Sequence, residues 1–401
     1  MGILLKSALV SSLLFAQHSF ARASDELSER FEFNGFARVV AGYLDESSAT
    51  FQDYGNDIDL SQQSLIALQG EFRISDALSI SSQLLAHSSA ERDSGVEWLY
   101  LTYQPNNNWR FKLGKLRTPF FRYSDTIDVG FAYPWISPPQ QVYSGFLFSN
   151  YEGVTGSYLF SYGGVNFDLE AYYGRYDGEI TREDERVDLE ADEIKGLIFS
   201  ASKGNLTARI SATQSSDFFA DVPAFTQFSE ILERAGFTEN AESLRFNGKV
   251  TGYQANINYD TLDYFLAAEW TRIRSDLLVV PQVDAYYFTA GYNFYPFQIH
   301  ASYSTSDTNN IVPVNQIPPG VSPQLDQISF VYEQITGNLP EYDLDSVTLG
   351  ARWDFLHNMS AKAEITVLDG EPGQRSFYSE IADPSFDRKA TLYQVAIEWV
   401  F

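Results

Sequence analysis

The stretch that decides the fold is Thr391-Leu392-Tyr393-Gln394-Val395-Ala396-Ile397-Glu398-Trp399-Val400-Phe401, the last residues of the sequence. Successive side chains of a β-strand point to opposite faces. The odd-numbered residues from 393 to 401 then share an apolar face that ends in aromatics. The other face mixes Gln394, Ala396 and Glu398 with Leu392 and Val400. About eleven residues is the length that a tilted strand needs to cross a membrane, so the stretch predicts a membrane-spanning strand.

The same alternation recurs upstream, in segments separated in turn by short turns and long polar loops. A first strand is expected near 31–43, and the clearest later strands are 347–355 and 359–367. This rhythm is typical of antiparallel up-and-down strands, and counting hairpins gives about sixteen, an even number as bacterial barrels have. Short turns are expected at 75–77, 104–108, 161–164, 202–205, 260–263, 295–296 and 356–358.

Aromatic residues flank these short turns, as Tyr103 and Trp109 do at one turn and Phe294 and Phe297 at another. Aromatic rings favour the head-group level of a membrane, so their repetition beside turns indicates a girdle at one end of a barrel. A soluble β-sandwich or propeller also has short alternating strands. Neither alternative explains an aromatic face on nearly every strand with short turns at one end only.

The N-terminal residues have the pattern of an export signal. Lys6 supplies a positive charge, 8–16 is a mostly apolar stretch, and Ala21-Arg22-Ala23 is a small-x-small cleavage pattern. We therefore expect 1–23 to be a cleaved signal peptide and 24–401 to be the barrel domain.

The composition excludes some classes of protein. Without Lys6 and Arg22, 25 basic residues face 53 acidic ones, a net charge of −28 that argues against nucleic-acid binding. The sequence has no cysteine, so disulfides and thiolate metal sites are impossible. No cofactor is expected.

The terminal strand resembles that of Gram-negative outer-membrane β-barrels, in which the last residue is typically Phe. This resemblance implies that Phe401, Trp399 and Tyr393 form an assembly signal. The barrel-assembly machinery would read this signal before the last strand closes the barrel against the first. It also implies a location in the cell outer membrane, in contact with outer-membrane lipid and lipopolysaccharide.

The most unusual internal segment is Gly114-Lys115-Leu116-Arg117-Thr118-Pro119-Phe120-Phe121-Arg122-Tyr123, followed by Asp125 and Asp128. Prolines and aromatics make such a loop stiff and able to pack inside a lumen. Arg117 and Arg122 carry fixed positive charge, and the two aspartates carry the opposite sign. Opposed charges in a narrow aqueous pore set its selectivity.

The pattern Gly-Lys-x-Arg-x-Pro-Phe resembles the opening of the third extracellular loop in trimeric porins, in the branch that includes the phosphate-selective porins. The resemblance implies a 16-stranded homotrimer in which the segment 117–150 folds into the barrel as the constriction. Strand parity places further cations on the lumen face, namely Arg38, Arg73, Arg110, Lys112, Arg209 and Arg352. Glu32, Glu71, Asp168, Glu170, Glu364 and Glu398 share that face. Because both signs are present, neither phosphate specificity nor an ion preference follows.

Two long extracellular loops, 215–246 and 305–343, contain helical periodicity. In the first loop, Gly236 is a natural helix stop after an apolar face made of Phe225, Phe228, Ile231, Leu232 and Ala235. In the second loop, Ser322 with Pro323 is a typical helix start. We expect both helices to pack their apolar faces over the barrel mouth. A third loop, 176–193, is acidic but lacks the spacing of a calcium loop, and we interpret it as a solvated surface.

The function predicted from these features is passive diffusion of small hydrophilic solutes and ions, without catalysis. One alternative is a barrel receptor or adhesin that binds through its loops. Another is an outer-membrane phospholipase-type enzyme with a Ser-His pair. His87-Ser88-Ser89 loosely resembles that enzyme class, but Ala90 and Glu91 replace its expected continuation, and no orienting group is evident.

Overall fold

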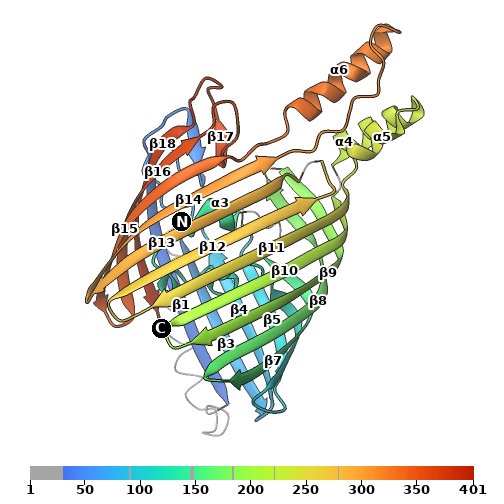
Figure 1. Cartoon of the computed structure of the whole chain (residues 1–401). Helices are drawn as coiled ribbons and strands as arrows, with labels where there is room; N and C mark the ends of the chain where they lie inside the picture. The colour runs from blue at the N-terminus through green and yellow to red at the C-terminus, as the bar shows by residue number, and fades with distance from the viewer. Residues whose placement is uncertain (1–29, 90–91, 145–148, 183–184, 221, 279) are drawn as a thin grey trace, which may run out of the picture.

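The computed structural model describes residues 30–89, 92–144, 149–182, 185–220, 222–278 and 280–401, so the expected signal peptide lies outside the described residues. Within these residues, 16 antiparallel strands close into a barrel in which β1 pairs with β18 on one side and β3 on the other (Figure 1). The barrel strands are β1 Phe31–Leu44, β3 Leu65–Ser75, β4 Leu78–His87, β5 Gly95–Tyr103, β6 Trp109–Arg117, β7 Asn150–Tyr162, β8 Val165–Arg182, β9 Glu185–Lys203, β10 Leu206–Ala220, β11 Asn247–Asp260, β12 Tyr264–Ser275, β13 Gln282–Phe294, β14 Phe297–Asn309, β15 Leu344–Leu356, β16 Met359–Gly370 and β18 Lys389–Val400.

The expected closure by the last strand is confirmed. β18 pairs with β1 from Phe36 opposite Val400 to Leu44 opposite Leu392. The seam continues one step further, because the Gly35 N–H donates to the Phe401 carbonyl at 2.7 Å and the Phe401 N–H donates back at 2.9 Å. A Cβ atom on Gly35 would lie 2.3 Å from the Phe401 ring, so the ring needs a glycine at this point.

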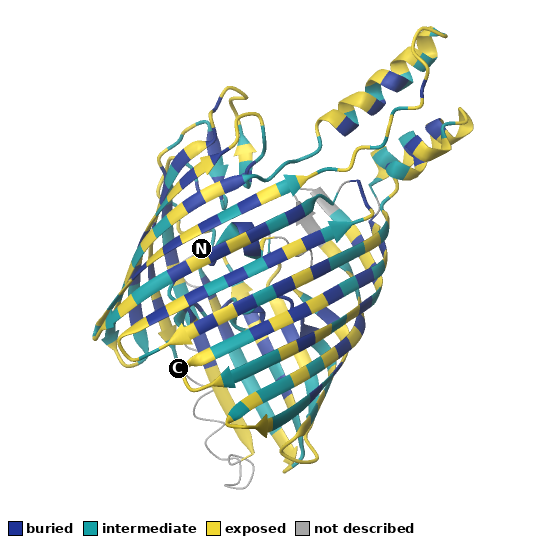
Figure 2. Ribbon diagram, viewed as in Figure 1, coloured by how far each residue is buried: buried dark blue, intermediate teal, exposed yellow. Residues whose placement is uncertain are grey.

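The two faces of β18 are also as expected. Val395 and Ile397 are 55% and 53% exposed, whereas Gln394 and Glu398 are 4% and 2% exposed. Figure 2 shows this alternation of buried and exposed residues along the front strands. Large apolar side chains face outward and polar ones inward, the reverse of a water-soluble protein, because the outer surface of such a barrel meets lipid.

All the short turns expected from the sequence join consecutive barrel strands, and they lie at one end of the barrel, here called the turn end. Aromatic rings gather there as expected: Trp109 and Tyr158 have centroids 4.7 Å apart, and Phe294 and Phe297 5.8 Å apart. The opposite end, the loop end, carries the long connections.

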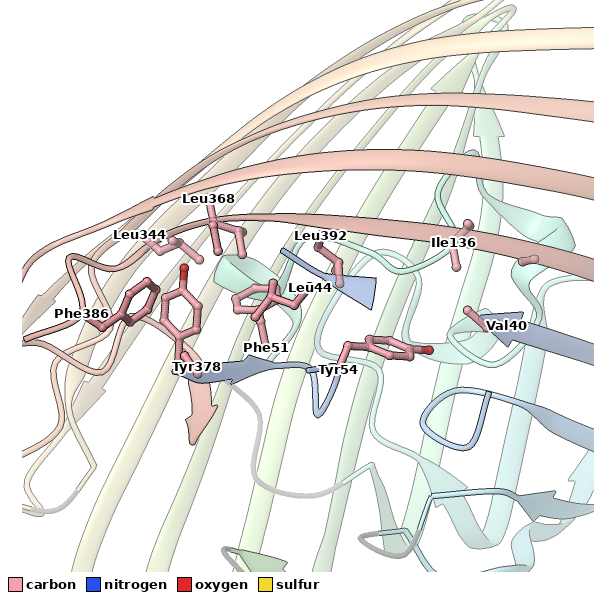
Figure 3. Packing of buried hydrophobic residues seen from close by; sticks show 13 residues of the cluster. Val40, Leu44, Phe51, Tyr54, Ile136, Leu344, Leu368, Tyr378, Phe386 and Leu392 are labelled. Carbon is pink, nitrogen blue, oxygen red and sulfur yellow. The ribbon is translucent and has the colours of Figure 1, made fainter. Parts of the chain in front are cut away.

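At the loop end, two short strands, β2 Ala49–Phe51 and β17 Tyr378–Ile381, form a separate sheet over the seam. Apolar side chains from this sheet, from the barrel strands and from the loop between β6 and β7 form one buried cluster (Figure 3). Tyr54, Leu44 and Ile136 are completely buried in it. The cluster lies at the loop end, against β1, β15, β16 and β18.

The expected loop helices form, but they do not cover the mouth. α4 Pro223–Arg234, α5 Thr238–Ser243 and α6 Pro323–Gly337 project away from the loop end as a helical arm (Figure 1). Their apolar faces pack on each other, and a 3.0 Å hydrogen bond joins the hydroxyls of Ser243 and Tyr332. β10 runs to Ala220, beyond the expected loop start at 215. No helix in the described part of the chain is long and apolar enough to span a membrane.

Candidate functional site: the loop inside the barrel

Residues 118–144, in the connection between β6 and β7, lie inside the barrel and are here called the inner loop. It contains the short helices η1 Ser124–Thr126, η2 Gly130–Ala132 and α3 Gln140–Tyr143. α3 lies against β12, β13 and β14, behind the front wall in Figure 1. The backbone and rings of the inner loop bond to inward-facing side chains on strands from β10 to β18, so these side chains determine its path.

Arg209 on β10 holds the first part of the inner loop. Its Nη1 donates to the Phe120 carbonyl at 3.0 Å and to Gln254 Oε1 at 2.5 Å, and its Nη2 donates to the Pro119 carbonyl. The Phe120 ring is fully buried against Gly252, where a Cβ atom would lie 2.4 Å from the ring. Arg209, expected to line the lumen, therefore anchors the loop.

Glu269 on β12 holds the next part. Its carboxylate accepts hydrogen bonds from the Arg122 N–H at 2.9 Å, the Tyr143 hydroxyl at 2.6 Å, the Tyr287 hydroxyl at 3.0 Å and Gln254 Nε2 at 2.9 Å. A buried carboxylate is tolerated when donors satisfy its oxygens. Glu269 thus ties both ends of the inner loop to one point of the wall.

Lys362 on β16 is the most complete anchor. Its Nζ donates to the carbonyls of Gly130, Tyr133 and Trp135 at 2.7, 2.9 and 2.7 Å, and it lies 3.1 Å from Glu398 Oε2. The Lys362 side chain is 0% exposed. An ammonium group has three donors, and here all of them are directed at the inner loop or its carboxylate partner.

Neighbouring contacts continue this attachment. Glu364 accepts the Ile136 N–H at 2.8 Å, and the Trp135 indole N–H donates to Ser302 Oγ at 2.8 Å. His300 Nε2 lies 3.4 Å from Glu364 on the same buried wall.

Arg117 and Asp128 form part of a buried charge cluster at the base of the inner loop. Arg117 lies 2.8 Å from Glu97 and 2.5 Å from Asp128, and Arg92 lies 2.5 Å from Asp128. Burial alone would raise the pKa of the Asp128 carboxyl, but Arg92 and Arg117 outweigh it and hold the pKa well below its usual range. The sequence predicted that Arg117 and Asp128 would face the open pore, whereas in the structure they neutralise each other within this cluster.

Three more expected lumen cations are occupied by partners. Arg352 donates to the Phe131 carbonyl at 3.0 Å and to Asp354 at 2.7 Å. Arg38 donates to the Gln63 carbonyl at 2.9 Å and to the Tyr133 hydroxyl at 3.3 Å. Arg73 pairs with Glu32 near the turn end, where both side chains are half exposed.

The remaining charges face water on the opposite wall. Asp125 is the exposed carboxylate of the inner loop, and it interacts electrostatically with Tyr100 and Glu170. Arg110 lies 3.8 Å from Asp168, and Lys112 Nζ lies 5.0 Å from the Tyr100 ring centroid. We call this set of exposed or partly exposed residues the charged sector: Glu71, Arg110, Lys112, Asp125, Asp168 and Glu170.

Arg122 lies outside the charged sector. Its guanidinium lines a cavity of about 260 Å³ with Tyr123, Asp260, Asn293 and Arg352, between the inner loop and the turn end. Its Cζ lies 5.4 Å from the Tyr123 ring centroid. The sequence predicted that Arg122 and Asp125 belong to one constriction. In the structure they lie on different sides of the inner loop.

Sequence reasoning missed Lys362, Glu269 and Arg92 as site residues. Strand parity placed Lys362 on the inward face with Glu364, and that was the signal that could have identified it. The alternative Ser-His arrangement has no support from the contact made by His87, whose Nδ1 accepts the backbone N–H of Ser89 at 3.0 Å. Among the described residues, no group of three or more His, Asp or Glu side chains could hold a metal ion.

Sequence comparisons give no match, either to a protein family or to a curated protein. Solved structures do match. The trimer form of OmpT from Vibrio cholerae has a TM-score of 0.54 at 15% identity, covering 92% of this chain and 99% of that one. An anion-selective porin from Comamonas acidovorans has a TM-score of 0.56 at 11% identity over 92% and 99%. OmpF of Salmonella typhi, in complex with daunomycin, has a TM-score of 0.56 at 13% identity and covers 92% of this chain and 97% of that one. The chain therefore has the fold of the 16-stranded porins of bacterial outer membranes.

Proposed function

We propose that the protein is a passive diffusion channel for small hydrophilic solutes and ions in the outer membrane of a Gram-negative bacterium. The observation that supports this function is the asymmetry of the lumen. The inner loop is attached to the wall from β10 to β18, while the charged sector, on β3, β6, β8 and the inner loop itself, keeps exposed or partly exposed charged side chains. Charged side chains that stay in contact with water inside a barrel are what an aqueous pore requires.

The charged sector favours cations over anions. It combines two basic residues, Arg110 and Lys112, with four acidic ones. Because the buried cations that hold the inner loop are paired with carboxylates or carbonyls, they contribute little to the field along the open path. A net negative constriction concentrates cations and lowers the local concentration of anions. In this proposal the turn end faces the periplasm and the loop end the outside.

The fold similarity to an OmpT trimer supports a homotrimer as the functional unit. The terminal residues Tyr393, Trp399 and Phe401 form the assembly signal in this proposal, and the chain is exported with its signal peptide cleaved. Transport needs no catalytic residue and no cofactor.

Conductance of the purified protein in a planar lipid bilayer tests this function. We expect stable open-channel steps, and a reversal potential in a salt gradient with the sign of cation preference. Folded protein, identified by its heat-modifiable mobility in electrophoresis, that inserts without conductance would contradict the channel function. That result would favour the receptor or adhesin, for which the projecting helical arm offers a binding surface.

A further inference from the structure

A group of polar side chains with unused hydrogen-bonding capacity lies on the turn-end side of the inner loop, away from the charged sector. It surrounds the cavity of about 260 Å³ that Arg122 lines. The inner loop supplies one wall with residues 122–123 and 131–135. The facing wall consists of residues near the turn ends of β11 to β15, among them Asp260, Gln298 and Arg352. The inner loop therefore lies between this cavity and the loop end.

Two side chains of this cavity carry opposite charges that no residue in the described part of the chain neutralises. Arg122 forms no ion pair with those residues, and its buried Nε has no hydrogen-bond partner among them. Asp260, at the exposed end of β11, interacts electrostatically with Arg122, but the two form no ion pair. An unpaired guanidinium and an unpaired carboxylate therefore line the same cavity.

The other charged groups around the cavity are already balanced. Asp354 accepts a hydrogen bond from Arg352 Nε at 2.7 Å. Arg209 acts electrostatically on the Glu269 carboxylate, whose oxygens also accept the four hydrogen bonds described above. The two unpaired groups therefore dominate the field inside the cavity, and their charges sum to zero. This balance favours neither a simple anion nor a simple cation, but it suits a molecule that carries both charges.

Uncharged groups of the cavity add further recognition. Gln298 Nε2 donates to Asn293 Oδ1 at 2.8 Å, and Gln298 Oε1 is buried without a donor from the described residues. A buried acceptor without a donor costs free energy, which the donor of a ligand recovers. The Tyr123 and Phe131 rings form apolar walls, with their centroids 5.4 Å from Arg122 Cζ and 4.0 Å from Arg352 Cζ.

We propose that this cavity binds a zwitterionic solute of amino-acid size, with its carboxylate on Arg122 and its ammonium group on Asp260 and Gln298 Oε1. A guanidinium group recognises a carboxylate through paired N–H donors, and an ammonium group has three donors for the facing oxygens. An apolar side chain of the solute then lies against the Tyr123 and Phe131 rings. The inference rests on the proposed function, because it names a class of solute for that channel.

The size of the cavity agrees with such a solute. Pockets for drug-sized ligands have volumes of about 300–1,000 Å³. The cavity, at about 260 Å³, is slightly smaller and suits a smaller molecule.

Calorimetric titration of the folded protein in detergent with three compounds of one carbon skeleton tests this site. Leucine carries both charges, leucinamide only the ammonium group, and 4-methylpentanoate only the carboxylate. We expect leucine to bind on the order of tenfold more tightly than either compound, since one hydrogen bond to a charged group contributes about this factor. A singly charged compound that binds as tightly as leucine would overturn the proposal.

Two single variants assign the two charges separately. R122Q should weaken the binding of leucine and 4-methylpentanoate about tenfold and leave that of leucinamide unchanged. D260N should weaken the binding of leucine and leucinamide and leave that of 4-methylpentanoate unchanged. The inner loop stays attached in R122Q because Glu269 accepts the backbone N–H of this position, and R122K should recover part of the affinity.

The matched control is R73Q, which removes another lumen arginine near the turn end, on β3, and should bind leucine as the wild type does. Heat-modifiable mobility in electrophoresis shows that each variant is folded. Unchanged leucine binding in both R122Q and D260N, or an equal loss in R73Q, would contradict the site.

Conductance in a planar bilayer separates this inference from the channel function. A barrel that conducts but does not bind leucine would overturn the zwitterion site alone. Leucine binding with the expected pattern of variants, in a protein that does not conduct, would support the site and contradict the channel function.

Discussion

Replacing Lys362 by Met should release part of the inner loop. The substitution keeps the length of the side chain but removes an ammonium group that donates to three loop carbonyls, at 2.7–2.9 Å. It also leaves Glu398, 2% exposed, without its cation. Removing one partner of a buried ion pair costs about 3–5 kcal/mol because the other charge stays buried.

The lost free energy weakens the attachment of the inner loop to the wall and not the barrel itself, because the barrel strands keep their own backbone hydrogen bonds. Detachment of the segment around Gly130, Tyr133 and Trp135 needs less free energy than unfolding the barrel. We therefore expect the variant to form barrels whose open-channel current is larger and noisier than that of the wild type. Single-channel recording at fixed voltage measures both quantities.

Two companion variants separate the anchor from a general loss of charge. In K362M/E398Q the unpaired carboxylate is also removed, so stability should return toward that of the wild type while the current remains noisy. Lys389→Met removes a lysine from the exposed pair with Asp369 and should leave the current unchanged. A Lys362→Met current as quiet as that of the wild type would refute the anchoring role of this lysine.

Four other outcomes follow from the structure. Asp125→Asn should lower the preference for cations and Lys112→Gln should raise it, and reversal potentials should show both shifts shrinking in molar salt, where the screening length is about 3 Å. Asp128→Asn leaves Arg92 and Arg117 with one carboxylate and should destabilise folded protein by about 3 kcal/mol. Because the pKa of Asp128 is depressed in the folded state, the stabilisation that its carboxylate provides is complete at pH values above the ordinary carboxyl pKa. It is lost only as the pH falls toward the depressed pKa. Thermal denaturation should therefore show an equal Asp128→Asn effect at pH 7 and pH 5, and a smaller effect at pH 5 would contradict the charge cluster. Ile397→Arg on the lipid face should cost about 2–4 kcal/mol in a folding assay, whereas Gln69→Arg on the lumen side of β3 should be tolerated, and equal losses would invalidate the assigned faces. Phe401→Asp should leave export intact but reduce the amount of heat-modifiable barrel in the outer membrane, and a normal amount would refute the assembly signal.

The sequence by itself determined the barrel. Side chains alternate between the inward and outward faces with a period of two residues in each strand, as from Thr391 to Phe401. This period can be recognised from neighbouring residues alone, without information about distant ones. Turn positions likewise depend on local residues, and each expected short turn is present. The caps of α6 were readable for the same reason, since Ser322 Oγ accepts the Leu325 N–H at 3.2 Å.

Only the tertiary structure decided what each lumen charge does. Parity put Arg209 and Arg352 on the inward face, but it could not show that loop carbonyls occupy their donors. The same limit applied to the loop helices, whose apolar faces were recognised but whose partner was wrongly taken to be the barrel mouth.

The physical reason is that charge partners are set by closure of the barrel. Lys362 and the Gly130 carbonyl are 232 residues apart in the chain but 2.7 Å apart in space. Arg117 and Asp128 are close in sequence, but this closeness alone does not bring them together. They pair because the inner loop returns to the wall where Arg92 and Glu97 lie. A strand pattern indicates which face a charge occupies, but only the path of the inner loop decides whether that charge meets water or a partner.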